Sequence, residues 1–499
     1  MKYESTREGT ATLLSSQAIL AGLAPDGGLY TPETIPSVSA RQLEELLPLS
    51  YQDRAMRILS LYLDDFSSDD LETCIHEAYS HQSFSHPEVA PVRSLSPDLG
   101  ILELWHGPTC AFKDIALQIL PHLLITSARM QQDDRTYVIL VATSGDTGKA
   151  ALEGFRDVDR TRILVFYPHG GVSQIQKLQM VTQEGNNVGV AAVTGNFDDT
   201  QTGVKAIFSD PEIRGLLDDH EMRFSSANSI NWGRLAPQIV YYFSAYCDMV
   251  NAGSINAGDL LNFVVPTGNF GNILAGYLAR EMGLPVGRLI CAANSNNVLT
   301  DFIRTGVYDR NRPFHRTISP SMDILISSNL ERLIYLMSGR DAGQIRDWMD
   351  QLNATGRYQV DGALQEAISG LFWSDYSTDE ETIQRIAQTY RDQNYLMDTH
   401  TAVAMDICER YRTKTGDATP AVVVSTASPF KFADSVARAI LPPALREGID
   451  EVELLKRISA ESEQPIPPAL SGLDSRPIRH DRVIDRPDMA GAVKAFLQL

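Results

Sequence analysis

The chain has 499 residues, of which 43% are hydrophobic and 21% are charged, so it is long enough for roughly two to four domains and too apolar to be disordered. Its formal charge of −20 at pH 7 predicts a surface that repels phosphate backbones, which argues against nucleic acid as a partner. A small anionic ligand would therefore need a locally basic or amide-rich pocket.

Residues 1–98 predict a small, mostly helical N-terminal domain, in which polar helical stretches alternate with turn signals such as Pro-Asp-Gly-Gly at residues 25–28. The chain begins without the apolar core of a signal peptide, and no stretch reaches the roughly 18 apolar residues of a membrane span. The five cysteines form no Cys-x-x-Cys pair, so neither zinc nor a disulfide framework is indicated. We expect a cytoplasmic location, with no metal and no membrane contact.

Residues 99–440 predict the main α/β region, with parallel or mixed sheets flanked by helices. Short segments rich in Val and Ile recur there, and each ends in a polar loop before a helical pattern, which is typical of βα units. The clearest predicted strands are residues 101–105, 137–142, 163–167, 263–265 and 421–424. Because ligands bind at the carboxyl ends of such strands, we expect their loops to surround one site between two α/β subdomains.

The last part of the chain has a different pattern of residues from the βα units before it. Residues 330–415 are mostly helical in pattern, still within the α/β region. Residues 441–499 contain paired prolines and end in a short amphipathic stretch, so we expect a C-terminal tail that wraps around the rest.

Two glycine-rich loops are candidates for binding an anion. Residues 268–272 read Gly-Asn-Phe-Gly-Asn and open a helical stretch, whose first N–H groups would be free to bind a phosphate, although a simple strand-to-helix turn gives the same pattern. Residues 145–149 read Gly-Asp-Thr-Gly-Lys, but the glycines are too close for a P-loop and Ala150 stands where Ser or Thr should bind Mg²⁺. We therefore reject a nucleotide triphosphatase.

Lys113 is the candidate for covalent chemistry. It lies between a proline-containing loop and the apolar run of residues 115–120. Burial at the start of an apolar helix would lower its pKa, which suits a lysine that forms a Schiff base. Most lysines are simply solvated, so the residue type and its neighbours alone do not decide the matter.

Four motifs taken together, in this order, resemble those of the threonine synthase family. They are His-Gly-Pro-Thr with Ala-Phe-Lys-Asp at 106–114, Thr-Ser-Gly-Asp-Thr-Gly at 143–148, Asn-Ser-Ile-Asn at 228–231, and residues 266–272. Residues 23–30 resemble the microbial and fungal branch, which has an extra N-terminal domain. The resemblance implies a fold-type II pyridoxal 5'-phosphate enzyme, similar to the tryptophan synthase β family, that converts O-phospho-L-homoserine and water to L-threonine and phosphate.

The resemblance also implies roles for individual residues. Lys113 would form the Schiff base with the cofactor and move protons in catalysis, Asp146 would lie near the ring hydroxyl, and Thr426 would face the pyridine nitrogen. The cofactor phosphate would bind backbone amides of Gly268, Asn269, Phe270, Gly271 and Asn272. From the residue types themselves, which offer hydroxyls, amides and a cation, we also expect the substrate phosphate to bind at Ser144, Thr147, Asn228, Ser229 and Arg234, with Lys149 adding to this group. For Arg234, a surface salt bridge is an equally good interpretation.

Three positions leave questions open. Ser428 stands where the family commonly has His, and Lys149 stands where a small residue is usual. His400 resembles a family position, but a helix start explains it as well as an active-site role does.

Two rival hypotheses remain besides threonine synthase, and the oligomer is expected to be a monomer or a homodimer. One rival is a threonine-synthase-like phospholyase that releases 2-oxobutyrate, phosphate and ammonia. The other is a non-catalytic metabolite-binding protein, although such drift should first remove Lys113 or the loop at 268–272, and both are present.

Overall fold

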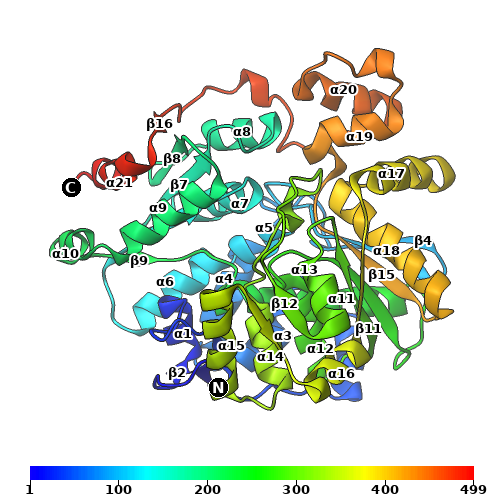
Figure 1. The fold of residues 1–499 in the computed structure, drawn as a ribbon, viewed down its shortest axis with the longest axis horizontal. Helices are drawn as coiled ribbons and strands as arrows, with labels where there is room; N and C mark the ends of the chain where they lie inside the picture. The colour runs from blue at the N-terminus through cyan, green and yellow to red at the C-terminus, as the bar shows by residue number, and fades with distance from the viewer.

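The computed structural model describes residues 1–499, apart from the side chain of residue 198. Two sheets of mostly parallel strands dominate it, and Figure 1 shows one around β11 and β15 and the other around β7 and β8. Within the described residues, no helix is both long and apolar enough to cross a membrane, and no cluster of His, Cys, Asp and Glu has the arrangement of a metal site.

The larger sheet has six strands in the order β14-β11-β10-β15-β5-β4. All neighbours are parallel except β4, which pairs antiparallel with β5 at the edge. Its central strands are buried along their whole length, because helices cover both faces of a parallel sheet. The strands are β4 Val92–Ser96, β5 Leu99–Glu103, β10 Leu261–Pro266, β11 Val286–Ala293, β14 Phe372–Tyr376 and β15 Ala421–Ser425.

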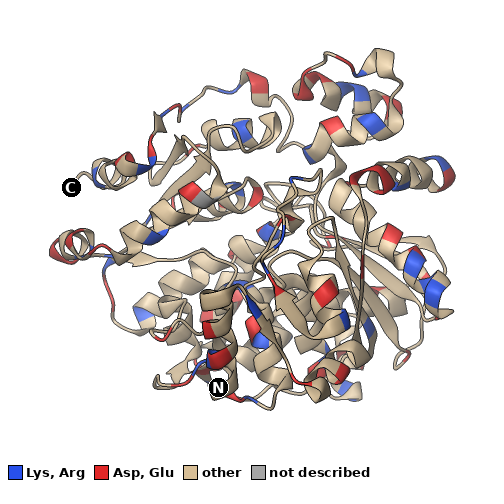
Figure 2. Cartoon of the chain, viewed as in Figure 1, with Lys and Arg blue, Asp and Glu red and all other residues tan. Residues whose placement is uncertain are grey.

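The second sheet has five parallel strands in the order β16-β8-β7-β6-β9. They are β6 Thr136–Ala142, β7 Thr161–Pro168, β8 Val188–Val193, β9 Met222–Ser225 and β16 Val483–Ile484. The helices between these strands are α7 Asp146–Phe155, α8 Gln174–Val181, α9 Phe197–Ser209 and α10 Pro211–Asp219. Acidic side chains are frequent on outer helices such as α10 (Figure 2), in keeping with the net charge.

Helices of the larger half surround its sheet and supply the connections of the βα units. They are α5 Lys113–Leu117, α6 Leu120–Met130, α11 Trp232–Asn251, α12 Gly271–Glu281, α13 Val298–Thr305, α14 Leu330–Met337, α15 Ala342–Thr355, α16 Gly362–Leu371, α17 Asp379–Gln393, α18 Thr399–Thr415 and α19 Ala433–Ile440. A two-stranded antiparallel pair, β12 Val307–Asp309 and β13 Arg357–Gln359, lies among them. The prediction that residues 330–415 are mostly helical is confirmed.

The N-terminal segment contains four helices and a small antiparallel sheet. The helices are α1 Ser15–Ala21, α2 Ala40–Leu46, α3 Tyr51–Tyr62 and α4 Ser68–Ala78, and the strands are β1 Lys2–Ser5, β2 Leu13–Leu14 and β3 Tyr30–Pro32. The rings of Tyr3 and Tyr62 each lie 5.3 Å from the fully buried ring of Trp232 in α11. This segment therefore shares one hydrophobic core with the larger half, and a domain boundary at residue 98 stays a prediction.

The C-terminal residues pass from one sheet to the other (Figure 1). Helix α20, Glu451–Ser462, packs on α19, and the chain then reaches β16, which pairs with β8. The last helix, α21 Met489–Leu497, buries Val493 and Leu497 in the apolar cluster of the smaller sheet. The tail thus packs on both halves of the fold.

Candidate active site

Lys113 is the first residue of α5, after the loop that follows β5. Its side chain is 12% exposed and lines a cavity of about 1350 Å³. Burial lowers the pKa of Lys113 to about 8; Asp146 opposes this change, and the positive charges of Lys431 and Arg234 favour it. Roughly a tenth of the amine is therefore uncharged at pH 7, far more than in an exposed lysine, and a nucleophile or a base requires this uncharged form.

Loops that follow strands of both sheets line the same cavity, as expected for the carboxyl ends of parallel strands. Besides Lys113, the predicted site residues on its wall are Ser144, Thr147, Asn228, Ser229, Arg234, Gly268, Asn269, Phe270, Gly271, Asn272 and Thr426. Two predicted residues, Asp146 and Lys149, do not line the cavity; the carboxylate of Asp146 lies next to the ammonium group of Lys113. The structure thus brings together residues that are up to 313 positions apart, from Lys113 to Thr426.

Asp146 is the anionic partner of two lysines. Its Oδ2 lies 3.8 Å from Nζ of Lys113, and its Oδ1 lies 3.0 Å from Nζ of Lys431. Gln176 also donates a hydrogen bond to Oδ1 at 2.9 Å. Burial alone would raise the pKa of Asp146, but the two ammonium groups outweigh it and hold that pKa well below its usual range. The carboxylate therefore stays ionised beside Lys113.

The loop at 268–272 has the backbone of an anion-binding turn. Phe270 takes the left-handed conformation, with φ of 64°, and makes no side-chain cap for α12, so the first amides of the helix remain without helical acceptors. A Cβ atom on Gly268 would lie 2.5 Å from the carbonyl oxygen of Ser321, so glycine is needed at this position. The side chain of Asn272 turns away and accepts hydrogen bonds from Tyr241 and Tyr242, which fixes the start of the helix.

A second polar group lies on the wall formed after β9. Arg234 is 4% exposed and donates to the carbonyl of Ala227 at 2.8 Å, while its buried Nε has no acceptor among the described residues. Burial lowers the pKa of Arg234 to about 10, at which the guanidinium is still charged at neutral pH. Asn228 accepts the backbone N–H of Ser229 at 2.6 Å in the adjoining turn. An anion would find a buried cation with a free donor here.

Local hydrogen bonds fix the conformation of the loop after β6. The Oγ1 atom of Thr143 accepts the N–H groups of Gly145 and Gly148 at 3.0 and 2.9 Å, which presents Ser144 and Thr147 to the cavity. Lys149 does not join them, contrary to our expectation. Its ammonium group pairs with Glu153 at 2.9 Å and contacts Gln183, because α7 turns this residue toward α8.

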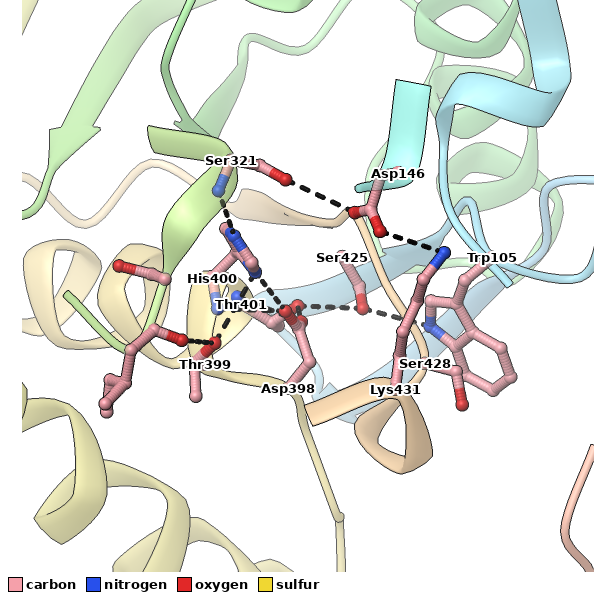
Figure 3. A network of polar contacts seen from close by, with 12 residues as sticks. Trp105, Asp146, Ser321, Asp398, Thr399, His400, Thr401, Ser425, Ser428 and Lys431 are labelled. Carbon is pink, nitrogen blue, oxygen red and sulfur yellow. Dashed lines mark hydrogen bonds and ion pairs between the residues drawn. The ribbon is translucent and has the colours of Figure 1, made fainter. Parts of the chain in front are cut away.

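The sequence did not predict several polar residues of the site. Ser321 contacts Lys113 at 3.2 Å, and Lys431 is fully buried against Asp146. His400, for which the sequence allows both a helix start and an active-site role, lines the cavity and pairs with Asp398 at 2.7 Å (Figure 3). Each comes from a segment without a glycine-rich loop.

The loop after β15 carries the remaining predicted residue. Thr426 is 6% exposed on the cavity wall, and its carbonyl accepts the N–H of Phe112, which ties this loop to the start of α5. Ser428 is fully buried, and its hydroxyl accepts the N–H of Phe430 at 3.4 Å. The serine therefore starts the short helical turn that carries Lys431.

These features fit a phosphorylated carbonyl cofactor. The wall offers a mostly buried lysine with a lowered pKa, amides without acceptors at the start of α12, and a position at 268 that accepts only glycine. A ring held by the lysine and a phosphate held by the amides would both face the same cavity. The fold and site thus define a lysine-based cofactor enzyme of the α/β class.

The comparisons with known proteins identify the family. The models "Threonine synthase N terminus" and "Threonine synthase, C-terminal" match residues 2–79 and 401–497. The threonine synthase of Pseudomonas aeruginosa is 41% identical over 88% of this chain and 90% of its own length. The crystal structure of a threonine synthase from Brucella melitensis with bound PLP is 36% identical, covers all of both chains and has a TM-score of 0.88. The chain belongs to the threonine synthase family.

Other relatives differ in length. The human protein named threonine synthase-like 1 is 41% identical over 88% of this chain, but the match covers 59% of that protein. The chain therefore spans about three fifths of the length of the first curated relatives it matches. Yeast threonine synthase, by contrast, is matched over 89% of its length at 40% identity.

Proposed function

We propose that this chain is a threonine synthase that uses pyridoxal 5'-phosphate to convert O-phospho-L-homoserine and water to L-threonine and phosphate. The observation that carries the proposal is the meeting of Lys113, the amides at 268–272 and Arg234 on one cavity. These three groups match the three requirements of the reaction: a Schiff-base lysine, a cradle for the cofactor phosphate and a cation for the substrate phosphate.

The positions of the cofactor residues support the roles that we propose for them. Lys113 would bind the cofactor covalently, and the amides of residues 268–272 would hold its phosphate. Asp146, kept ionised by Lys431, would accept a hydrogen bond from the ring hydroxyl. Thr426 would face the pyridine nitrogen with a neutral hydroxyl, which leaves that nitrogen largely unprotonated. Bound pyridoxal phosphate supplies an electron sink that makes protons on the substrate carbons removable.

Lys113 is the proposed base for two neighbouring carbons. Its amine would take the proton from Cα and then one from Cβ of the substrate, after which the γ-phosphate leaves and water adds at Cβ. A long, flexible side chain can reach both carbons, and a pKa of about 8 keeps enough of the amine unprotonated to act. The neighbouring carboxylate of Asp146 would stabilise the ammonium formed after each proton transfer.

The substrate phosphate would bind away from Lys113, on the wall that carries Arg234. The free Nε donor of Arg234 and the polar side chains of Ser144, Thr147, Asn228 and Ser229 provide the locally basic, donor-rich pocket that an acidic protein needs for a dianion. Arg234 is buried, which argues against the surface salt bridge that the sequence had left open.

One experiment tests the proposal against both rivals. The purified chain is incubated with pyridoxal phosphate and O-phospho-L-homoserine while phosphate, threonine and 2-oxobutyrate are measured together. Equal amounts of phosphate and threonine are expected. Phosphate with 2-oxobutyrate and without threonine would identify the phospholyase. A colourless protein that releases no phosphate would identify a binding protein.

A variant of the proposed lysine makes the test specific. Lys113→Ala should lose the absorption of the bound cofactor and reduce turnover by at least about a thousandfold, because no other group can take over both functions. Lys177→Ala, on the exposed face of α8, is the matched control and should behave like the wild type. A cytoplasmic location and a monomeric or homodimeric state stay predictions.

A further inference from the structure

We propose that Ser321 is a further catalytic residue of this site, whose hydroxyl holds the Lys113 amine while it carries protons, and that His400 and Asp398 position Ser321. The inference rests on the proposed function, since it assigns a role in the same proton transfers. It begins from one contact: Oγ of Ser321 lies 3.2 Å from Nζ of Lys113 and 3.2 Å from Oδ2 of Asp146.

The hydroxyl of Ser321 completes the surroundings of the amine. It can accept one N–H of Lys113 while donating its own proton to Asp146, so the three groups form a closed triangle. Asp146 alone is 3.8 Å from the amine, which is too far for a well-made hydrogen bond. A lysine that must direct its lone pair at substrate carbons gains orientation from a fixed acceptor on the opposite side.

The backbone of Ser321 is held from two sides. Its carbonyl oxygen lies against Gly268, where an added Cβ would come within 2.5 Å. Its N–H donates to Nε2 of His400 at 3.1 Å. Because Nε2 accepts a backbone N–H, Nδ1 of His400 must carry the ring proton, and this proton faces Oδ2 of Asp398 at 2.7 Å. His400 and Asp398, which we call the dyad, therefore present an acceptor to the backbone N–H of Ser321, as Figure 3 shows.

The dyad is itself rigid. Asp398 is fully buried and caps α18 by accepting the N–H groups of His400 and Thr401 at 2.9 and 3.1 Å. The hydroxyl of Thr401 donates to Asp398 and lies 2.9 Å from the hydroxyl of Ser425, which also accepts the indole N–H of Trp105 at 3.0 Å. The ring of His400 is 2% exposed and packs on Phe432 with a centroid distance of 4.8 Å.

A cap for α18 would need only Asp398. The orientation of the His400 ring toward the backbone of Ser321, on a cavity wall, is an additional feature that a helix start does not require. A chain of hydrogen bonds thus runs from β15 through Asp398 and His400 to the backbone N–H of Ser321, whose hydroxyl contacts Lys113. We therefore assign His400 to the active site as a positioning residue.

Variants can separate the hydroxyl from the dyad. Ser321→Ala should lower kcat about 10- to 100-fold, the range for a lost hydrogen bond to a charged group, with KM nearly unchanged. His400→Asn keeps a donor near Nδ1 for Asp398 but lacks an acceptor at the Nε2 position, so it should show the same loss. His400→Gln places a carbonyl near the Nε2 position and should retain most of the activity. His81→Asn, on an exposed loop, is the control.

The double variant Ser321→Ala, His400→Asn decides whether the two residues act through one contact. Its loss in kcat should be close to that of either single variant, because the dyad has no further effect once the hydroxyl is absent. The kinetic isotope effect with substrate deuterated at Cα should rise in all three variants. Losses that multiply in the double variant, or an unchanged isotope effect, would overturn the proposal.

A second readout needs neither cofactor nor substrate. The pH dependence of Lys113 acetylation in the cofactor-free protein, followed by peptide mass spectrometry, reports the pKa of the amine in the presence of Asp146, Lys431 and Arg234. Ser321→Ala, which removes the acceptor, should lower the pH midpoint of Lys113 acetylation below the wild-type value. His400→Asn should also lower this midpoint. An unchanged midpoint would refute the contact even if the chain makes no threonine, so failure here is distinct from failure of the proposed function.

Discussion

The carboxylate of Asp146 pairs with the ammonium group of Lys431 at 3.0 Å, and the lysine side chain is completely buried. Lys431 also donates to the carbonyl of Thr109 at 2.8 Å, so two of its three donors have acceptors. A buried charge of this kind is tolerated only when it is paired. The pair fixes the charge state of Asp146 from the side away from Lys113 and links the loop after β15 to the start of α7.

Replacing Lys431 should therefore change both stability and titration. Lys431→Met removes one partner of a buried ion pair, and we expect the free energy of unfolding to fall by about 3 kcal/mol. The pKa of Lys113 should rise above about 8, because a nearby positive charge is lost. Urea denaturation and acetylation of Lys113 across pH measure the two effects. Lys456 in α20 is 63% exposed, so Lys456→Met is the control and should change neither quantity. A Lys431→Met protein that is as stable as the wild type and has an unchanged acetylation midpoint would contradict the role of Lys431 as the buried partner of Asp146.

The lowered pKa of Lys113 also predicts how stability depends on pH. Lys113 titrates near 8 in the folded protein but near 10.5 when exposed, so between these values the unfolded chain binds more protons. The contribution of Lys113 to the free energy of unfolding should thus rise as pH increases through this window. The cofactor-free wild type should gain about 3 kcal/mol relative to Lys113→Met between pH 8 and 10.5. A difference that stays constant with pH would show that burial does not perturb this amine.

Much of the central fold was predictable because buried parallel strands are continuous apolar runs. The predicted strands at 137–142 and 421–424 correspond to β6 and β15 within one residue at either end. The strand β1, Lys2–Ser5, was missed, since its sequence Lys-Tyr-Glu-Ser has no apolar run. Its stability comes from pairing with β3 and from the contact of Tyr3 with Trp232, which the local sequence does not reveal.

The site was predictable to a similar extent and for a related reason. Glycine-rich loops and a lysine before an apolar helix carry local signals, and these residues do lie on one cavity. Ser321 and Lys431 depend on tertiary contacts. Ser321 reaches Lys113 across 208 positions of sequence, and Lys431, which follows β15 of the larger sheet, reaches Asp146, which follows β6 of the other sheet. Lys149 shows the opposite case: its sequence neighbours predicted a place in the substrate pocket, but its position on α7 directs the side chain to Glu153 instead.

Gly268 offers a steric test of the proposed cofactor cradle. Gly268→Ala would place a Cβ atom 2.5 Å from the carbonyl oxygen of Ser321, so the loop at 268–272 must shift. We expect the dissociation constant for pyridoxal phosphate to rise at least about tenfold, since displaced amides lose hydrogen bonds to the phosphate. Titration of the apoprotein by absorbance measures this. Gly215→Ala, in α10 with no atom near its Cβ, is the matched control, and equal affinities in both variants would exclude the cradle.

Arg234 should distinguish binding of the substrate phosphate from binding of the cofactor. Arg234→Met removes a buried cation whose Nε has no acceptor among the described residues, so a dianionic group would lose its charged donor. We expect kcat/KM for O-phospho-L-homoserine to fall about 100- to 1000-fold, with most of the effect in KM, while the affinity for pyridoxal phosphate stays within about threefold. Arg280→Met, which loses only a surface pair with Glu281, should leave both unchanged.

The alternative for Arg234 is a purely structural role, because its guanidinium also donates to the carbonyl of Ala227. Arg234→Lys separates the two: it keeps the positive charge but cannot reproduce both the bond to the carbonyl and a second, planar donor. If the arginine binds phosphate, inorganic phosphate should inhibit the wild type competitively and inhibit Arg234→Met far less, at equal thermal stability. Equal inhibition of both proteins would mean that the substrate phosphate binds elsewhere on the cavity wall, and Ser144 and Thr147 would then be the next residues to replace.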